Sequence, residues 1–220
     1  MTNDASAIPP SPSAADYAGE ADRPLIPNVS EPFALLDIWL KEARASEPND
    51  SSAMTLATVD ENGLPDARIV LLRGVSPEGL KFYTNFGSAK SQQVQASGKA
   101  ALCLHWKSLR RQVRVRGSIA RLPDADSDAY FKMRTPQSRI SAIASDQSQP
   151  LKDRAIFMQR IGELSEIYGD SEDIPRPPNW GGFRVIPDVV EFWQDQAFRM
   201  HDRLQLTRTP DGWSGTRLYP

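Results

Sequence analysis

The chain contains few of the residues on which metal and disulfide chemistry depend. Among its 220 residues are one cysteine, Cys103, and two histidines, His105 and His201. One cysteine cannot form an internal disulfide, and these three side chains are too few for a zinc-ligand cluster. The G-x-S-x-G, Walker and G-x-G-x-x-G motifs are absent as well. The sequence therefore excludes a disulfide scaffold and argues against metal, serine-nucleophile and P-loop chemistry.

Long apolar runs and a strong charge of one sign are also missing. The longest aliphatic run, Ile69 to Leu72, falls far short of the roughly 20 residues that a membrane helix needs. No basic residue precedes Arg23, although a secretory signal needs one. The 26 basic and 28 acidic residues give a net charge of -2 and a pI near 5.8. With Cys103 in an apolar run typical of a reducing compartment, we expect a cytoplasmic protein without a membrane or nucleic-acid partner.

Composition divides the chain into a tail and one domain. Residues 1–30 are rich in Ala, Ser and Pro, carry four acids against one base and show no apolar period. Such a segment cannot offset the entropy that it would lose on ordering, so we expect a flexible tail. The whole chain is 40% apolar, which is enough for residues 31–220 to form a single domain with one core.

The apolar pattern after residue 50 predicts a series of short strands. Two β-rich runs flank an Asn62-Gly63 turn and form a hairpin. Short strands with tight connections favour an antiparallel barrel or sandwich over a parallel sheet. The expected strands cover residues 53–59, 67–75, 80–86, 100–106, 111–122, 181–187, 189–204 and 213–220.

Helical spacing and capping residues predict helices beside these strands. One covers residues 30–46, with Ser30 as its cap, and a short helix opens at residues 87–90. A third covers residues 124–133. The clearest covers residues 151–168, which carry Ile156, Phe157, Ile161, Leu164 and Ile167 on one side. Residues 135–150 are small and polar, so we expect a loop with at most one helical turn.

Two short stretches favour anion binding. A Gly-Ser turn that opens a helix at residues 87–90 would expose backbone N–H groups, and Lys90 adds a positive charge. A capped helix with a surface lysine explains the same residues. Residues 107–116 carry five bases, but Val113 and Val115 alternate with the polar side chains and leave a basic face too narrow to favour RNA. Scattered basic and hydroxyl groups of this kind suit one or two small phosphorylated ligands.

Residues 189–204 concentrate the side chains best suited to chemistry. An extended backbone from Phe198 would place Arg199, His201 and Arg203 on one face. Arginine binds planar anions with a fixed fork of donors, and histidine changes its protonation near neutral pH. A solvated edge strand, with Asp202 paired to a neighbouring arginine, is the alternative that the pattern leaves open.

Seven segments stand out when they are taken together and in order. They are RIVLLR (68–73), FYTNFGSAK (82–90), RRQVRV (110–115), YFKMRTPQS (130–138), DQSQ (146–149), NWGGFRV (179–185) and EFWQDQAFRMHDR (191–203). From about residue 31 to the C-terminus, this set resembles the pyridoxamine 5'-phosphate oxidase family. The resemblance implies a mainly β fold with flanking α-helices, an antiparallel Greek-key split β-barrel that binds FMN. It also implies a homodimer with two FMN sites at the subunit interface.

The resemblance also carries ligand-binding roles onto the matching positions. FMN would contact the segment Arg68, Ile69, Val70, Leu71, Leu72 and Arg73, and beyond it Tyr83, Thr84, Ser88, Ala89, Lys90, Gln112, Gln147, Ser148, Trp193 and Arg203, some of them from the partner subunit. The substrate would contact Arg73, Tyr130, Arg134, Ser138, Arg199, Met200 and His201. Arg199 and His201, which would cover the pyridine ring, are the expected catalytic residues.

The implied reaction removes a hydride from C4' of pyridoxamine or pyridoxine 5'-phosphate to N5 of FMN, after which dioxygen reoxidises the flavin and hydrogen peroxide leaves. Two alternatives remain: a related split-barrel flavoenzyme with another aromatic substrate, and a protein that carries FMN or pyridoxal phosphate without turnover. Three positions depart from the family pattern, because Arg73 replaces a lysine, Ala89 a basic or polar residue, and Ile143 a tryptophan. We expect weaker ligand binding rather than a lost reaction.

Overall fold

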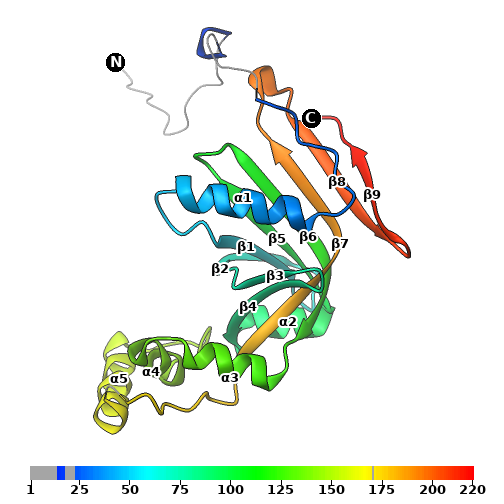
Figure 1. Ribbon diagram of the computed structural model, residues 1–220. Coiled ribbons are helices and arrows are strands. Elements are labelled where there is room, and N and C mark those ends of the chain that lie inside the picture. The colour runs from blue at the N-terminus through cyan, green and yellow to red at the C-terminus, as the bar shows by residue number, and fades with distance from the viewer. Residues whose placement is uncertain (1–13, 18–22, 170) are drawn as a thin grey trace.

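The computed structural model describes residues 14–17, 23–169 and 171–220. They form an antiparallel sheet of nine strands in the order β2-β1-β5-β6-β7-β4-β3, and β8 and β9 extend it beyond β7 (Figure 1). The strands are β1 (Ala53–Val59), β2 (Pro65–Leu71), β3 (Gly74–Ser76), β4 (Gly79–Asn85), β5 (Lys99–Trp106), β6 (Arg111–Arg121), β7 (Trp180–Gln194), β8 (Asp202–Thr209) and β9 (Gly212–Arg217). The expected class, mainly β with flanking helices, is confirmed.

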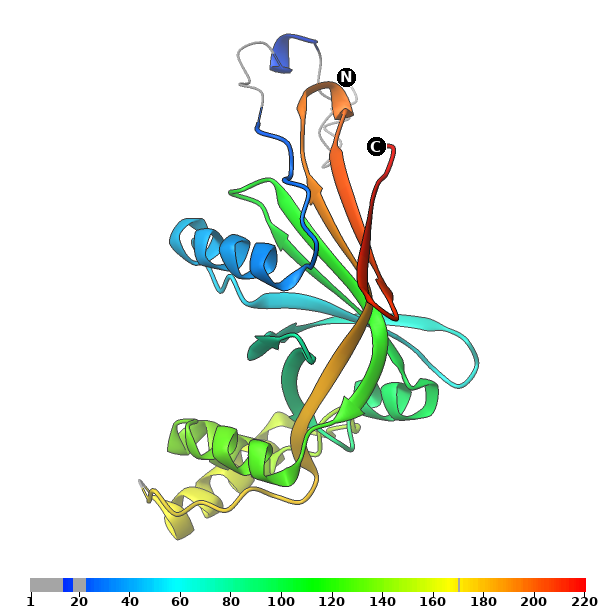
Figure 2. The same cartoon turned by 45° about the vertical axis from the view of Figure 1, so that its right-hand side comes forward.

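Strand β7 belongs to both halves of the sheet. Its first residues, Trp180 to Val185, pair with β4, whereas Val189 to Gln194 pair with β8. Strand β6 runs along both parts and shifts register at a β-bulge between Arg116 and Gly117. Figure 2 shows β7 passing through the middle of the molecule, from the helices at one end to the β8 hairpin at the other. The bulge increases the local twist, so the two halves of the sheet face different directions.

The main core lies between the sheet and helix α1 (Phe33–Ser46). Alternate residues of β1, β5 and β6 point inward, as the period of a half-buried strand requires. Trp39 of α1 packs edge-on against Phe192 of β7, with the ring centroids 5.1 Å apart. Glu31 accepts hydrogen bonds from the first two backbone N–H groups of α1, at 2.7 and 2.9 Å. Glu31 therefore caps this helix, and the expectation that Ser30 does so is wrong.

A second, smaller core holds three helices at the end of the molecule where β7 begins. These helices are α3 (Asp124–Lys132), α4 (Pro136–Ala144) and α5 (Arg154–Tyr168). Phe131, Ile140, Ile174 and Trp180 are the buried residues between them. The apolar side expected for α5 is only partly covered, because Ile161 and Leu164 pack on this core while Ile156 and Ile167 remain exposed.

Two expected elements before residue 150 differ from the structure. The loop predicted over residues 135–150 contains the nine-residue helix α4, in which Thr135 Oγ1 accepts a hydrogen bond from the backbone N–H of Ser138 and Pro136 occupies the first turn. A threonine cap and a proline in the first turn are both ordinary signals of a helix start. The prediction of a loop gave more weight to the polar composition of the segment. The single strand predicted over residues 67–75 is two strands, because the chain turns inward at Leu72, whose side chain is 6% exposed.

Part of the expected N-terminal tail is packed on the sheet. Residues 23–29 lie beside β8, where Ile26 is 2% exposed and its backbone N–H donates to Asp202 Oδ2 at 2.6 Å. The Gln194 side chain donates to the Pro24 carbonyl at 2.7 Å. A short 3-10 helix, η1 (Ala14–Tyr17), brings Tyr17 to a ring-centroid distance of 4.8 Å from Phe198. The other expected tail residues before 23 lie outside the described part of the chain. Among the described helices, none is long and apolar enough to cross a membrane.

The bulge predicts an effect on stability. A Cβ atom at Gly117 would lie 1.9 Å from the Ile186 carbonyl oxygen, so Gly117→Ala should force the β6 and β7 backbones apart and destabilise the fold by about 1–3 kcal/mol or more. Gly162 of α5 has open space around it, so Gly162→Ala should stabilise the fold by roughly 0.5–1 kcal/mol. Thermal unfolding midpoints should therefore move in opposite directions. Equal midpoints for the two variants would contradict this account of the bulge.

Candidate functional site

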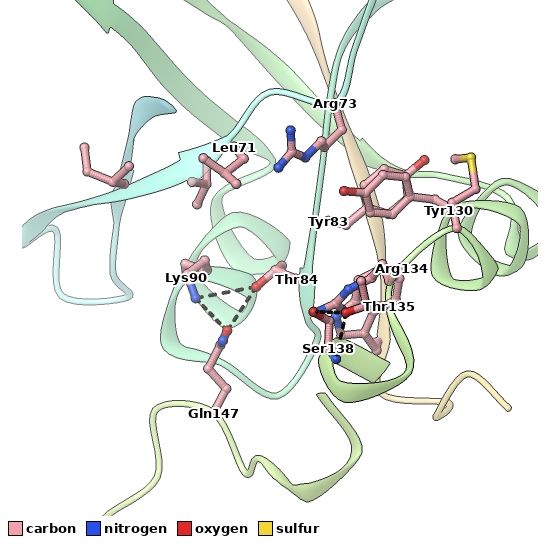
Figure 3. A pocket seen from close by; sticks show the side chains of 14 residues that line it. Leu71, Arg73, Tyr83, Thr84, Lys90, Tyr130, Arg134, Thr135, Ser138 and Gln147 are labelled. Carbon is pink, nitrogen blue, oxygen red and sulfur yellow. Dashed lines mark hydrogen bonds between the residues drawn. The ribbon is translucent and has the colours of Figure 1, made fainter. Parts of the chain in front are cut away.

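A cavity of about 630 Å³ lies between β2, β4, α3, α4 and helix α2 (Ala89–Ser97) (Figure 3). Three cationic side chains reach it from different elements: Arg73 from the end of β2, Lys90 from α2 and Arg134 from the α3–α4 turn. Its wall is formed by Ile69, Val70, Leu71, Arg73, Tyr83, Thr84, Lys90, Tyr130, Met133, Arg134, Thr135, Ser138, Gln147 and Trp180. Figure 3 shows Lys90 and Gln147 on one side of the cavity and Arg134, with Tyr83 and Tyr130, on the other, and Arg73 interacts electrostatically with Arg134.

Lys90 and Thr84 form the first end. The Lys90 ammonium donates to Gln147 Oε1 at 2.8 Å, and the Thr84 hydroxyl donates to the same oxygen at 3.0 Å. Burial, with a smaller contribution from the Arg68 charge, lowers the pKa of Lys90. The charge of Asp66 acts in the opposite direction and only partly offsets these two effects. An anion bound here would stabilise the ammonium further. The neutral amide oxygen of Gln147 is a weaker acceptor than a phosphate oxygen would be.

Arg68 stands behind this end and is held by a small polar network. Its Nη1 donates to Thr58 Oγ1 at 2.5 Å, and its Nη2 donates to Gln93 Oε1 at 3.0 Å and pairs with Asp66. A hydrogen bond from Gln93, with the nearby Arg68 charge, lowers the pKa of Asp66. Thr58 and Gln93 were not among the predicted site residues, because an isolated threonine and glutamine carry no motif. Their effect is to hold the Arg68 guanidinium near Lys90.

Stacked aromatic rings form the second end. The rings of Tyr83 and Tyr130 lie 3.9 Å apart and nearly parallel, and the Trp180 ring continues the stack at 5.6 Å from Tyr83. The Arg134 guanidinium lies 5.0 Å from the Trp180 ring centroid, a cation–π contact that fixes its direction. Burial raises the pKa of Tyr83, so its phenol stays protonated at neutral pH and can donate a hydrogen bond. Sequence analysis did not select Trp180 as a site residue, although it lies within the segment NWGGFRV (179–185).

The start of α4 adds hydroxyl groups to the second end. Thr135 Oγ1 and Ser138 Oγ lie 2.9 Å apart, and both residues line the cavity. Arg73 reaches the same region and donates to Ser52 Oγ at 3.3 Å. Two guanidiniums and two hydroxyls are a donor set that suits a phosphate group, since arginine binds phosphate with paired N–H donors.

Several expected FMN contacts lie elsewhere. Ser88 is fully buried, and its hydroxyl donates to the Asn85 carbonyl at 2.7 Å rather than facing the cavity. Leu72 points into the main core. Ala89 is exposed but does not line the cavity, and Ser148, with a positive φ of 72°, lines a neighbouring smaller one. The other predicted residues of this region, from both the FMN set and the phosphate-binding set, line the cavity or stand directly behind it.

The remaining predicted residues form a second group, at the other end of β7. Trp193 pairs with Gln112 of β6 and with Arg203 of β8, and its ring centroid is 4.7 Å from that of His201. Arg203 Nε donates to Glu191 Oε1 at 2.9 Å. None of these residues lines the cavity, nor do Arg199 and Met200. Figures 1 and 2 agree in placing the turn between β7 and β8 at one end of the molecule and α3–α5 at the other.

The predicted strand face of this group is wrong. The chain between β7 and β8 forms a 3-10 turn, η2 (Ala197–Arg199), in which Phe198 and Arg199 have left-handed φ values of 54° and 60°. Strand β8 begins only at Asp202, so Arg199 and His201 do not share a strand face with Arg203. They are brought near one another by a turn, which the two-residue period of a strand could not predict.

Solved structures with a similar fold define the class of the protein. PhzG from Burkholderia lata 383, solved with tetrahydrophenazine-1-carboxylic acid, has a TM-score of 0.82 and 29% identity over 87% of this chain and 94% of that one. A pyridoxamine 5'-phosphate oxidase-related, FMN-binding protein from Nostoc punctiforme has a TM-score of 0.70 and 21% identity, over 85% of this chain and 96% of that one. The chain therefore has the split-barrel fold of FMN-binding proteins, as expected.

Sequence comparison then gives the family. The model of pyridoxamine 5'-phosphate oxidase matches residues 40–168, and that of the pyridoxine 5'-phosphate oxidase C-terminal dimerisation region matches residues 180–220. A relative named pyridoxine/pyridoxamine 5'-phosphate oxidase from Hyphomonas neptunium is 64% identical over 98% of this chain and 99% of that protein. One of the same name from Caulobacter vibrioides is 48% identical over the full length of both. The chain belongs to the pyridoxamine 5'-phosphate oxidase family.

The lowered pKa of Lys90 predicts how ligand binding depends on pH. An ammonium binds a phosphate and a neutral amine does not, so FMN affinity should fall as the pH rises through the pKa of Lys90, earlier than for an exposed lysine. Lys90→Arg should keep its affinity over the same range, because arginine stays charged. The control is Lys107→Arg at an exposed lysine, which should behave like the unchanged protein. Dissociation constants for FMN, titrated from neutral pH to about 10, measure this. Identical pH dependence for Lys90→Arg and the unchanged protein would contradict a role for Lys90.

Proposed function

We propose that this protein is an FMN-dependent oxidase that converts pyridoxamine 5'-phosphate and pyridoxine 5'-phosphate to pyridoxal 5'-phosphate, with dioxygen as the acceptor and hydrogen peroxide as the second product. The observation that carries the proposal is the single cavity with two cationic ends, at Lys90 and at Arg73 with Arg134. Two such ends suit two phosphorylated ligands side by side. Relatives of 64% and 48% identity bear the name of this activity.

The Lys90 end fits the phosphate of FMN. It offers an ammonium, the Thr84 hydroxyl and, behind them, the Arg68 guanidinium. Between the two ends, the edge strand β2 presents Ile69 and Leu71, which are 64% and 37% exposed, to the wall of the cavity. A flat ring placed against them would bury apolar surface. Bound FMN would supply the redox chemistry by taking two electrons from the substrate and passing them to dioxygen.

The other end would hold the phosphate of the substrate. Arg73, Arg134 and Ser138 supply its donors, and Trp180 keeps Arg134 in place through the cation–π contact. The protonated phenol of Tyr83, stacked on Tyr130, adds a neutral donor at the same end. A substrate that is anchored by its phosphate would hold its reacting carbon in a fixed position against the cofactor. Holding the reacting atoms together in this way lowers the activation free energy of the reaction.

The protein forms a homodimer, since residues 180–220 match the dimerisation region of the family. From Trp180, at the cavity, to Trp193, beside His201, the strand rises by up to roughly 40 Å. Arg199 and His201 follow the far end of this strand, at the opposite end of the molecule from α3–α5, and they do not line the cavity of their own chain (Figure 1). We propose that the partner subunit's Arg199 and His201 complete the site, together with its Gln112, Trp193 and Arg203.

The strained turn at η2 supports a functional role for Arg199. Two successive non-glycine residues, Phe198 and Arg199, are held in left-handed backbone conformations, which cost on the order of 1–3 kcal/mol each. Strain of this kind persists where the surrounding contacts hold a side chain in a required position. Arg199 would position the substrate ring against the cofactor, and His201 would orient the same ring.

The three departures from the family pattern have different settings. Arg73 is exposed at the cavity and retains the charge, although a guanidinium needs more room than an ammonium. Ala89 is exposed at the start of α2 and offers no side-chain donor. Ile143 packs against the second core, where its contribution is to apolar packing. The proposed effect of these changes is on ligand affinity rather than on the reaction.

A cytoplasmic location is part of the proposal. Burial raises the pKa of the Cys103 thiol, which keeps it protonated and weakly reactive. The sequence contains no second cysteine with which it could form an internal disulfide. A reducing compartment suits such a thiol.

The visible spectrum tests the proposed reaction. The purified protein should release FMN, and not FAD, on heating, and its flavin absorbance should bleach on anaerobic addition of pyridoxine or pyridoxamine 5'-phosphate. Admitting air should restore the colour and produce hydrogen peroxide. A yellow protein that never bleaches would indicate a carrier without turnover. Bleaching only by an unrelated aromatic reductant, such as a tetrahydrophenazine, would indicate a related flavoenzyme with another substrate.

Substitutions in the second group should separate turnover from cofactor binding. Arg199→Ala and His201→Ala should lower kcat/KM for pyridoxine 5'-phosphate while leaving FMN bound. For Arg199, a charge-assisted contact of roughly 1.5–3 kcal/mol corresponds to about one to two decades in rate. Arg203→Ala should mainly raise the FMN dissociation constant. If Arg199→Ala and His201→Ala kept full kcat/KM at saturating FMN, the proposed roles would be wrong.

A further inference from the structure

His201 is held by a carboxylate that no motif selected. Its Nδ1 lies 2.9 Å from Asp195 Oδ1, and one face of its ring lies against Trp193. Both side chains are largely shielded, with exposed fractions of 19% for His201 and 15% for Asp195. Because a carboxylate can only accept hydrogen bonds, this contact requires a proton on Nδ1. The remaining nitrogen, Nε2, is then the one that His201 can offer to a ligand.

Asp195 is itself fixed on three sides. Its carboxylate pairs with Arg110 in the turn between β5 and β6, and its backbone N–H donates to the Arg110 carbonyl at 3.0 Å. The Arg23 guanidinium donates to the Asp195 carbonyl at 3.2 Å. The carboxylate therefore has little freedom to follow the imidazole, and the imidazole must adapt to the carboxylate. This is the arrangement by which a neighbouring acid sets the tautomer and direction of a histidine.

We propose that Asp195 is a positioning residue for the oxidase reaction, which accepts the Nδ1 proton of His201 and so presents Nε2 to the substrate. The inference rests on the proposed role of His201 at the site completed by the partner subunit. Asp195 does not touch the substrate in this arrangement. It acts through His201, as an outer carboxylate does when it orients a histidine bound to a metal.

One other contact would give the opposite tautomer. The backbone N–H of Gln196 lies 3.4 Å from the same Nδ1 and could donate to it, which would leave the proton on Nε2. The contact with Asp195 is shorter, at 2.9 Å against 3.4 Å, and its acceptor is charged. Charge-assisted hydrogen bonds are roughly twice as strong as neutral ones. The carboxylate therefore decides the position of the proton.

The tautomer can be measured directly, because the sequence has only two histidines. Protein labelled with 15N-histidine should give two imidazole spectra, and the exposed His105, replaced in His105→Gln, identifies which one is His201. At alkaline pH, where imidazoles are neutral, the FMN-loaded dimer should carry its His201 proton on Nδ1. Asp195→Ala should shift that proton toward Nε2, with Gln196 as the remaining donor to Nδ1. A proton already on Nε2 in the unchanged protein would overturn the proposal without any variant.

Kinetics test the consequence for the reaction. Asp195→Ala should lower kcat for pyridoxine 5'-phosphate by about tenfold and leave the FMN dissociation constant nearly unchanged. Asp195→Asn should retain most of kcat, since its amide oxygen still accepts the Nδ1 proton although the charge opposite Arg110 is lost. The control, Glu42→Gln, removes an ion pair with Arg111 at the same end of the sheet and should leave both kcat and the tautomer unchanged.

These results separate the inference from the function on which it rests. If the protein had no oxidase activity, the proposed function would be wrong. The tautomer of His201 would still test the contact between Asp195 and His201. If His201→Ala lowers kcat and Asp195→Ala does not, Asp195 has no positioning role. An equal loss of kcat in Asp195→Asn, Asp195→Ala and Glu42→Gln would mean that the ion pairs at this end act through stability alone, which also overturns the proposal.

Discussion

The pairing of β7 with β6 is the constraint on which the site depends. One continuous strand begins at Trp180 beside the cavity and ends at Gln194, just before the turn that carries Arg199. Backbone hydrogen bonds to β6 hold it along both halves, and the register changes only at the bulge next to Gly117. The separation of the two groups of functional residues is therefore built into the backbone. Because the strand holds the two groups apart, the proposed site needs the second subunit to bring them together.

Preorganisation is the common property of the cationic groups. Arg68 is held by Thr58 and Gln93, and Arg134 by the Trp180 ring, through contacts within the protein itself. Groups fixed in this way lose little conformational freedom when a ligand binds, so more of the interaction energy remains for affinity. The cost is the burial of charge: burial, and to a smaller extent repulsion from the Arg68 charge, lowers the pKa of Lys90. A bound phosphate would remove that repulsion and stabilise the folded protein.

Sequence reasoning predicted the fold class and most strands, because these depend on local period, whereas most of the residues that line the cavity came from the resemblance to the family. It failed where tertiary contacts decide the backbone. The sequence predicts a strand at Phe198, because no residue there is one that favours a left-handed backbone conformation. Helix α4 carries its start signals at Thr135 and Pro136, yet its polar composition is that of a loop. Trp180 contacts Arg134, which is distant in sequence, and Asp195 contacts His201 across a turn. A periodic pattern along the sequence cannot predict contacts of either kind.

The docking of residues 23–29 has a consequence for how the chain matures. These residues bond to partners about 170 positions later, such as Gln194, which donates to the Pro24 carbonyl. On a ribosome, which adds residues in order, Ile26 and the segment around it cannot find these partners until about 170 further residues have been made. Contacts of such long range are slow to form. The docking of this segment should therefore be a late event in folding.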